Sequence, residues 1–140
     1  MPMRVLVPMD HSPLAGRALE EALESHPDAE ISVLHVIDYV EQAGAAQLLL
    51  GSEELEARAE ERTDVLFERA REIAADYNSE IETTRRVGEP SREILRYVET
   101  HNLDRIVVGS HGRSAVGRFI LGSVAEYVLR HSPVPVTVVR

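Results

Sequence analysis

The sequence contains neither cysteine nor lysine. Without cysteine, the chain has no disulfides, no thiolate metal ligands and no cysteine nucleophile. Without lysine it cannot form a Walker A loop, and it also lacks the G-x-G-x-x-G fingerprint of dinucleotide-binding folds. The G-x-S-x-G motif of α/β-hydrolases and the motif set of protein kinases are absent as well. These absences exclude several common classes of nucleotide-binding proteins and hydrolases.

Long apolar runs are also missing, and the charge is strongly of one sign. No segment approaches the length of a membrane span, and the first residues lack the hydrophobic region of a signal peptide. We therefore expect a cytoplasmic protein with no membrane partner. The formal net charge of −9 argues against a nucleic-acid partner, because non-specific binding to nucleic acid requires a basic surface.

The charged residues show an excess of acidic side chains and a single type of basic side chain. All 15 basic residues are arginine, against 24 acidic residues. This composition indicates a salt-adapted, halophilic cytoplasm, while biased codon usage is an alternative explanation of the missing lysine. The 140 residues, of which 44% are hydrophobic, predict one domain over residues 1–140 that buries a core without disulfides or metals.

Short apolar runs alternate with amphipathic segments along the chain. Runs of strand length lie at residues 5–9, 31–37, 80–87, 103–108 and 133–139. Helical periodicity lies over residues 12–23, 53–77 and 88–101, and again from residue 123. Residues 39–52 have no clean period and form either a short helix or a flap. Strands that alternate with helices predict right-handed βαβ units, and therefore an α/β protein with a parallel sheet.

The carboxyl ends of three expected strands carry candidate ligand-binding residues. Asp10 follows the first strand, Val36 lies near the end of the second, and Gly109 follows the fourth. Because ligands of open parallel sheets bind beyond the carboxyl ends of the strands, these segments should converge on one crevice. Pro135 has no N–H and places the last strand at a sheet edge. A bare valine-rich edge favours a homodimer, although one of the chain's own helices could cover it instead.

The stretch from Val107 to Ser123 contains four glycines, at positions 109, 112, 117 and 122. It follows an apolar strand and ends where the pattern S-x-x-E predicts a helix capped by Ser123. Glycine permits positive φ and close backbone approach, so such a turn can aim several N–H groups at one anion. The helix start adds further N–H groups. The stretch therefore predicts a nucleotide site.

The spacing of these glycines follows a known pattern. Gly109-x2-Gly112-x9-Gly122-Ser123 has the form G-2x-G-9x-G-[S/T], and in this it resembles the ATP-binding branch of the universal stress protein family. Other segments resemble that family in the same order along the chain: residues 7–12 (VPMDHS), 34–38 (LHVID), 88–90 (GEP) and 132–136 (SPVPV). The resemblance covers essentially the whole chain except the stretch near residues 39–52.

The resemblance implies an open, Rossmann-like, five-stranded parallel sheet of order 3-2-1-4-5 with helices on both faces. It also implies a homodimer through the last strand, and ATP at the carboxyl ends of strands one and four. In this arrangement Pro8 and Val36 contact adenine, Asp10 binds the ribose hydroxyls, and Val108 and Gly109 border base and ribose. The phosphates would be surrounded by Gly112, Arg113, Gly122, Ser123 and Val124, and the position of His111 between two glycines adds it to this group.

Several of these residues have competing structural interpretations. Asp10 could merely cap the following helix, although a carboxylate also suits two vicinal hydroxyls. Arg113 and Arg118 fit phosphate contacts and solvated loop positions equally. His111 can donate to phosphate but has no oriented partner for general-base catalysis. Any Mg2+ or Mn2+ would be held by the ATP phosphates and water, because no acidic pair in the glycine stretch could anchor it.

The sequence thus favours a nucleotide-dependent dimeric switch in the stress response, with no catalytic residue assigned and at most slow ATP hydrolysis. One alternative is a true ATPase or nucleotidyl-transfer enzyme that uses His111 and Arg113. The other is an interaction module that binds a different adenine nucleotide, such as a cyclic one. His35 lies in an apolar strand and is interpreted as a core histidine, and the remaining histidines have no metal-ligand spacing.

Overall fold

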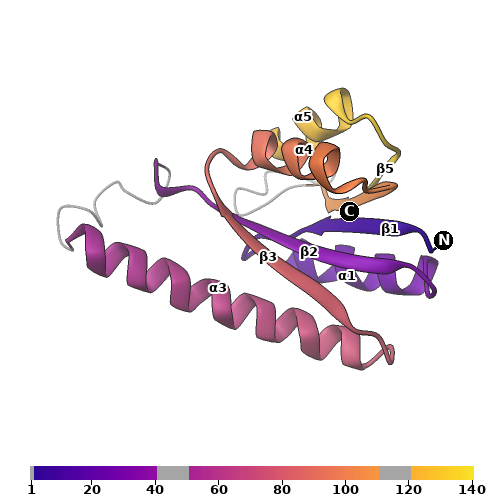
Figure 1. The fold of residues 1–140 in the computed structure, drawn as a ribbon, viewed down its shortest axis with the longest axis horizontal. Coiled ribbons are helices and arrows are strands. Elements are labelled where there is room, and N and C mark those ends of the chain that lie inside the picture. The colour runs from indigo at the N-terminus through magenta and orange to yellow at the C-terminus, as the bar shows by residue number, and fades with distance from the viewer. Residues whose placement is uncertain (1, 41–50, 111–120) are drawn as a thin grey trace.

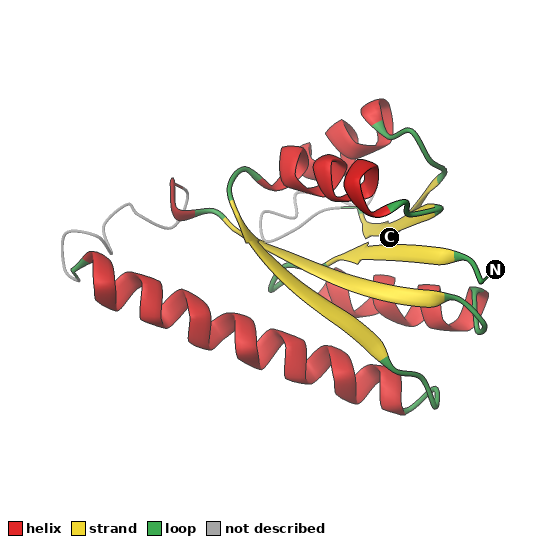
Figure 2. Cartoon of the chain, in the orientation of Figure 1, coloured by secondary structure: helices red, strands yellow, loops and turns green. Residues whose placement is uncertain are grey.

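The computed structural model describes residues 2–40, 51–110 and 121–140, and these form one open sheet (Figures 1 and 2). Its strands are β1 (Arg4–Pro8), β2 (Glu30–Ile37), β3 (Ile81–Val87), β4 (Arg105–Gly109) and β5 (Val136–Val139). Every pairing is parallel, and the strand order is β3-β2-β1-β4-β5. The predicted order 3-2-1-4-5 is confirmed, so β1 and β4 lie side by side at the centre of the sheet.

The helices of the described residues cover both faces of this sheet, as predicted. They are α1 (Pro13–Ser25), α3 (Ser52–Ala75), α4 (Pro90–His101) and α5 (Ser123–His131). Figure 1 shows α1 and α3 on one face and α4 and α5 on the other. Both α1 and α4 have proline at the first helical position. Proline suits this position because its fixed φ is helical and it has no N–H to leave unpaired.

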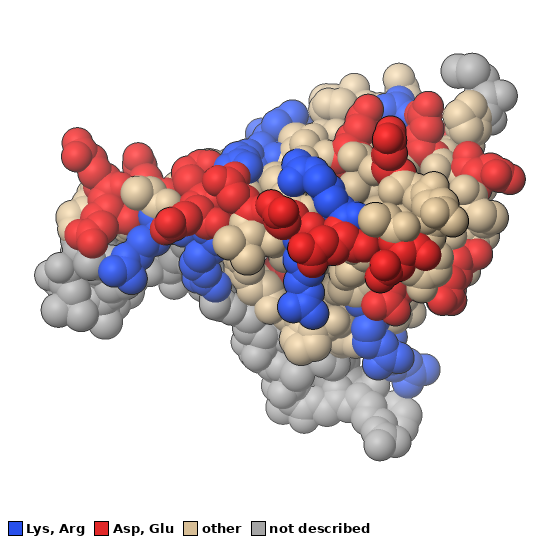
Figure 3. Space-filling model, turned by 90° about the horizontal axis from the view of Figure 1, so that it is seen from below, with Lys and Arg blue, Asp and Glu red and all other residues tan. Residues whose placement is uncertain are grey.

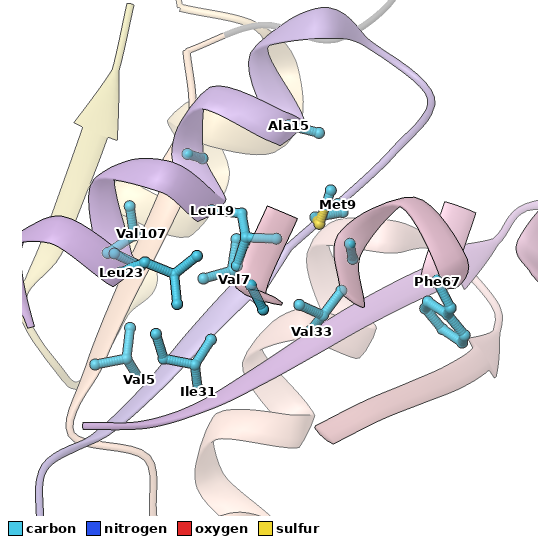
Figure 4. Packing of buried hydrophobic residues seen from close by; sticks show 14 of the residues in the cluster. Val5, Val7, Met9, Ala15, Leu19, Leu23, Ile31, Val33, Phe67 and Val107 are labelled. Atoms are coloured by element: carbon cyan, nitrogen blue, oxygen red, sulfur yellow. The ribbon is translucent and has the colours of Figure 1, made fainter. Parts of the chain in front are cut away.

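The strands bury side chains on both faces, so successive residues of a strand enter different cores. Val5 and Val7 of β1 pack with Val33 beneath α1 and α3 (Figure 4), whereas Leu6 packs with Ile106 beneath α4 and α5. All five side chains are 0% exposed. The near-continuous apolar runs in the sequence follow from this burial on both faces, which is typical of parallel sheets.

Helix α3 is long and mostly solvated. It has 24 residues, and its first turns extend past the sheet (Figure 1). Its buried residues recur every three or four positions, at Ala59, Thr63, Leu66, Phe67, Ala70 and Ala74. The exposed side of the helix carries acidic and arginine side chains (Figure 3). No helix in the described ranges has the length and apolar character needed to cross a bilayer.

Helix α5 begins at Ser123, as predicted, but Ser123 does not cap it. Gly122, not Ser123, is the N-cap, with φ −67° and ψ 162°, and its carbonyl accepts the N–H of Glu126 at 2.9 Å. Ser123 is the first helical residue and is exposed, and no side-chain hydrogen bond caps the helix. The cap prediction for Ser123 is wrong because a tertiary contact determines the helix start: the Gly122 N–H donates to the carbonyl of Ser110 at 2.6 Å.

Strand β5 lies at the edge of the sheet, as predicted from Pro135, but it is shorter than the predicted run over 133–139. It begins at Val136, and the carbonyl of Pro135 accepts the N–H of Ile106 at 3.0 Å. Pro133 and Pro135 have no N–H to contribute to a ladder, which explains the late start.

Candidate functional site

The first part of the candidate site is the turn that follows β1. The Met9 N–H donates to the carbonyl of Leu34 at 2.8 Å, after which the chain leaves the sheet. Asp10 is half-buried, and its Oδ1 accepts a hydrogen bond from the Ser12 N–H at 2.8 Å. The structural role considered for Asp10 is therefore present, since its carboxylate organises the turn before α1. Within the part of the chain that the structure describes, this hydrogen bond from Ser12 is made to Oδ1 and not to Oδ2.

The second part of the site is the end of β4, where Gly109 lies against the first turn of α1. A Cβ atom at position 109 would lie 3.0 Å from the Cβ of Leu14. Neither Gly109 nor Gly122 adopts φ in the left-handed region. Positive φ is therefore not what glycine contributes at these two positions. At Gly109 the requirement is close approach between helix and strand.

Ser110 joins three elements at this end of the sheet, although the sequence analysis gives it no role. It is 1% exposed. Its N–H donates to the carbonyl of Val139 in β5 at 2.7 Å, and its carbonyl accepts the Gly122 N–H at 2.6 Å. The start of α5 is thus held against the end of β4. The only signal in the sequence was the position of Ser110 inside the glycine stretch, which does not distinguish it from a solvated loop serine.

The third part of the site is the first turn of α5. The N–H groups of Ser123 and Val124 have no partner within the helix, as at every helix start, and the helix dipole favours an anion there. Glu126 in the same turn pairs with Arg130, with Oε1 and Nη2 3.1 Å apart, which offsets part of its repulsion of an anion. The arrangement can donate backbone hydrogen bonds to a phosphate.

The apolar residues expected around adenine lie on three adjacent strands. Pro8 and Val108 are buried at the ends of β1 and β4. Val36 is half-buried on β2, two residues beyond Leu34, which pairs with Pro8. The structure therefore brings Pro8, Val108 and Val36 to the same end of the sheet as Asp10.

The remaining predicted phosphate ligands, His111, Gly112 and Arg113, lie outside the described residues, as do Arg118 and residues 41–50. Their contacts, and the enzyme alternative that uses two of them, stay predictions. Within the described ranges, no group of three His, Asp or Glu side chains is arranged to hold a metal ion. A divalent ion carried by ATP phosphates also stays a prediction.

His35 is a core histidine with a satisfied polar atom, as interpreted from the sequence. It is 5% exposed, and its Nδ1 lies 2.7 Å from the carbonyl oxygen of Met9. Burial lowers the pKa of His35 below 6.5, with smaller contributions from Arg62 and Arg85, while the Met9 carbonyl and Asp10 oppose the shift. The ring is therefore neutral at physiological pH.

This lowered pKa predicts a pH dependence of folding. The unfolded chain protonates His35 as the pH falls through about 6.5, whereas the folded chain does so only at lower pH. The contribution of His35 is thus fully present above pH 6.5 and is lost below it, with a slope of at most about 1.4 kcal/mol per pH unit. Urea unfolding between pH 7.5 and 5 should show this loss, and His35→Asn should show a smaller slope. If His35→Asn shows the same slope as wild type, the protonation of His35 is not the cause of the loss of stability.

The sheet order defines the class of protein. The strands run outward from β1 to β3 on one side and from β4 to β5 on the other, so the order reverses between β1 and β4. This is the topology of a doubly wound α/β protein, in which ligands bind at the switch point. Asp10, Gly109, Ser110 and the start of α5 all lie there.

Comparison with known proteins identifies the family. The model of the universal stress protein family matches residues 1–140, and the chain belongs to that family. It is 34% identical over 145 residues to the universal stress protein YxiE of Bacillus subtilis, with 98% of each chain covered. It is 30% identical over 152 residues to MJ0577 of Methanocaldococcus jannaschii, covering 98% of this chain and 94% of that protein.

Solved structures share the fold over the same length. The structure of MJ0577 has a TM-score of 0.83, covering 99% of this chain and 96% of that chain. A universal stress protein in complex with cAMP is 24% identical, with a TM-score of 0.72, and covers 99% of this chain and 97% of that chain. At that identity the second likeness shows the fold alone.

Proposed function

We propose that this universal stress protein binds ATP at the switch point between β1 and β4 and acts as a nucleotide-dependent dimeric switch in the cytoplasm. One observation carries the proposal: the Asp10 carboxylate and the first-turn N–H groups of α5 lie at the same end of the sheet. A carboxylate suits ribose hydroxyls, and helix N–H groups suit phosphates. A nucleoside phosphate requires both.

The roles of individual residues follow from this arrangement. Asp10 accepts from the ribose hydroxyls while its Oδ1 keeps the Ser12 contact. Pro8, Val108 and the backbone of Val36 border the adenine, and Gly109 leaves room for the ribose. The backbone of Gly122, Ser123 and Val124 faces the phosphates, and His111, Gly112 and Arg113 complete that side, as in the glycine motif. Mg2+ or Mn2+ is carried by the phosphates.

ATP is favoured over other adenine nucleotides by the complete glycine motif, whose spacing is that of the ATP-binding branch. A protein of the same fold, 24% identical to this chain, has been solved in complex with cAMP. It keeps the alternative of a cyclic nucleotide open. The protein is proposed to hydrolyse ATP slowly at most, because no residue is assigned as an oriented general base.

The homodimer is assigned to the free edge of β5. Val136, Val138 and Val139 are half-buried in the single chain, and among the described residues the strand pairs with β4 alone. Ser110 connects this edge to the nucleotide site, because it binds Val139 through its N–H and Gly122 through its carbonyl. A nucleotide that shifts the start of α5 would therefore act on the dimer edge through one residue. Equilibrium sedimentation with and without ATP measures the mass in solution, and so tests whether the protein is a dimer and whether ATP changes this.

The decisive experiment is a calorimetric titration of nucleotide-free protein with Mg-ATP, AMP and cAMP. Wild type should bind ATP most tightly, and Asp10→Asn should weaken ATP binding by about tenfold to a hundredfold, because a charged hydrogen bond contributes about 1.5–3 kcal/mol. Asparagine retains Oδ1 for the Ser12 contact, so the fold should be preserved.

Asp28→Asn is the matched control, since Asp28 is exposed and precedes the amino end of β2. It should bind ATP like wild type. The titrations are made both in low and in molar salt. If the protein belongs to the proposed salt-adapted cytoplasm, its fold should be more stable at high salt. If no nucleotide co-purifies and wild type gives no heat at millimolar ATP, the proposed function is wrong.

A further inference from the structure

We propose that His35 is a positioning residue for Asp10, and that it orients the carboxylate which binds the ribose. The inference rests on the proposed function. Its basis is that His35 contacts the residue on each side of Asp10: its Nδ1 lies 2.7 Å from the Met9 carbonyl oxygen, and its ring packs edge-on against His11, with centroids 5.1 Å apart at 70°.

The hydrogen bond acts on the peptide unit that leads into Asp10. Strand β1 ends at Pro8, and Met9 makes the last main-chain bond to β2, through its N–H to Leu34. The carbonyl of Met9 belongs to the same planar peptide as the N–H of Asp10. His35 donates to that carbonyl and so fixes the plane from which the Asp10 side chain projects.

The direction of the bond determines the tautomer. A carbonyl oxygen can only accept, so Nδ1 of His35 carries the proton. Met9 is 4% exposed and His35 is 5% exposed, which leaves the carbonyl without water as a substitute donor. Loss of the donor would leave a buried carbonyl unsatisfied, and the turn would rearrange to reach another donor or solvent.

Three contacts hold the short turn that contains Asp10. His35 holds Met9 and His11, and the Ser12 N–H holds Oδ1 of Asp10. Together they leave the Asp10 carboxylate little freedom, and Oδ2 is the oxygen that the Ser12 N–H does not occupy.

The test uses three substitutions and two nucleotides. His35→Asn keeps an amide N–H close to the position of Nδ1, His35→Gln moves it toward the position of Nε2, and His35→Leu removes it. Mg-ATP and Mg-2′,3′-dideoxy-ATP differ only in the ribose hydroxyls that Asp10 binds. All proteins are titrated at pH 7.5, where the ring of His35 is neutral, and folding is checked by circular dichroism and urea unfolding.

We expect His35→Leu and His35→Gln to weaken ATP binding by about tenfold and dideoxy-ATP binding by less than about twofold. His35→Asn should recover most of the ATP affinity. Combining His35→Gln with Asp10→Asn should cost little more than Asp10→Asn alone, because the two residues act through one contact. If His35→Leu does not fold, the comparison of asparagine with glutamine provides the same test.

Equal losses for the two nucleotides, or losses that add to those of Asp10→Asn, would overturn the positioning role and leave the proposed function intact. A wild-type protein that binds ATP and dideoxy-ATP equally would overturn the ribose role of Asp10, and the positioning role with it.

Discussion

A valine in place of Gly109 should lower the free energy of unfolding by about 1–3 kcal/mol and weaken ATP binding at the same time. A Cβ atom there would lie 3.0 Å from the Cβ of Leu14 and 3.4 Å from its main-chain carbon and oxygen. Leu14 is buried in the first turn of α1, so the strain falls on helix backbone. The start of α1 would have to move, and with it the turn in which Ser12 binds Asp10.

Urea unfolding and an ATP titration measure the two effects. Gly16→Ala is the matched control, because a Cβ there would meet only the Cδ1 of Ile73, at 3.6 Å. Gly16 lies within α1, so alanine should instead stabilise the protein by about 0.5–1 kcal/mol. A Gly109→Val protein as stable as wild type would refute the proposed requirement for close packing of α1 on β4.

Leu6→Ala should have the largest effect on stability, a loss of about 2–5 kcal/mol. Leu6 is 0% exposed and lies in the central strand β1, where it packs against the cluster beneath α4 and α5. Because β1 is hydrogen-bonded to β2 and β4 on its two sides, the surrounding backbone has little freedom to collapse into the cavity.

The control for this substitution is Leu129→Ala, which makes the same chemical change on the surface of α5. Leu129 is 45% exposed, and its loss should change the free energy of unfolding by no more than about 0.5 kcal/mol. Equilibrium urea unfolding compares the two variants. Similar losses at both positions would contradict the packing of the core described here.

Much of the fold could be predicted from local sequence. The apolar run over residues 31–37 and the helical period over 53–77 correspond to β2 and α3, with ends displaced by one or two residues. These sequence patterns match the observed elements because the spacing of apolar residues depends on which side chains of a strand or helix are buried. The strand order was an expectation from the resemblance to universal stress proteins, since periodicity contains no information about which strands pair.

The candidate site was predictable in part. Asp10 and Gly109 were identified because parallel strands place their carboxyl ends together. Ser123 was wrongly assigned as a cap because the local S-x-x-E pattern cannot show that the Gly122 N–H is already bound to Ser110. His35 was correctly interpreted as buried, but its partner Met9 could not be found without the register of β1 against β2.

By itself, the sequence determined the class of the protein, the alternation of its elements and the residues that end its strands, because these depend on spacing and on side chains close together in the chain. Only the tertiary structure decided which residue caps α5, why a side chain at position 109 would crowd α1, and which group holds the turn before Asp10. Each of those depends on a contact between distant residues, namely Ser110 with Gly122, Gly109 with Leu14 and His35 with Met9. Such contacts are determined by how the elements pack, and no local pattern of residue types encodes them.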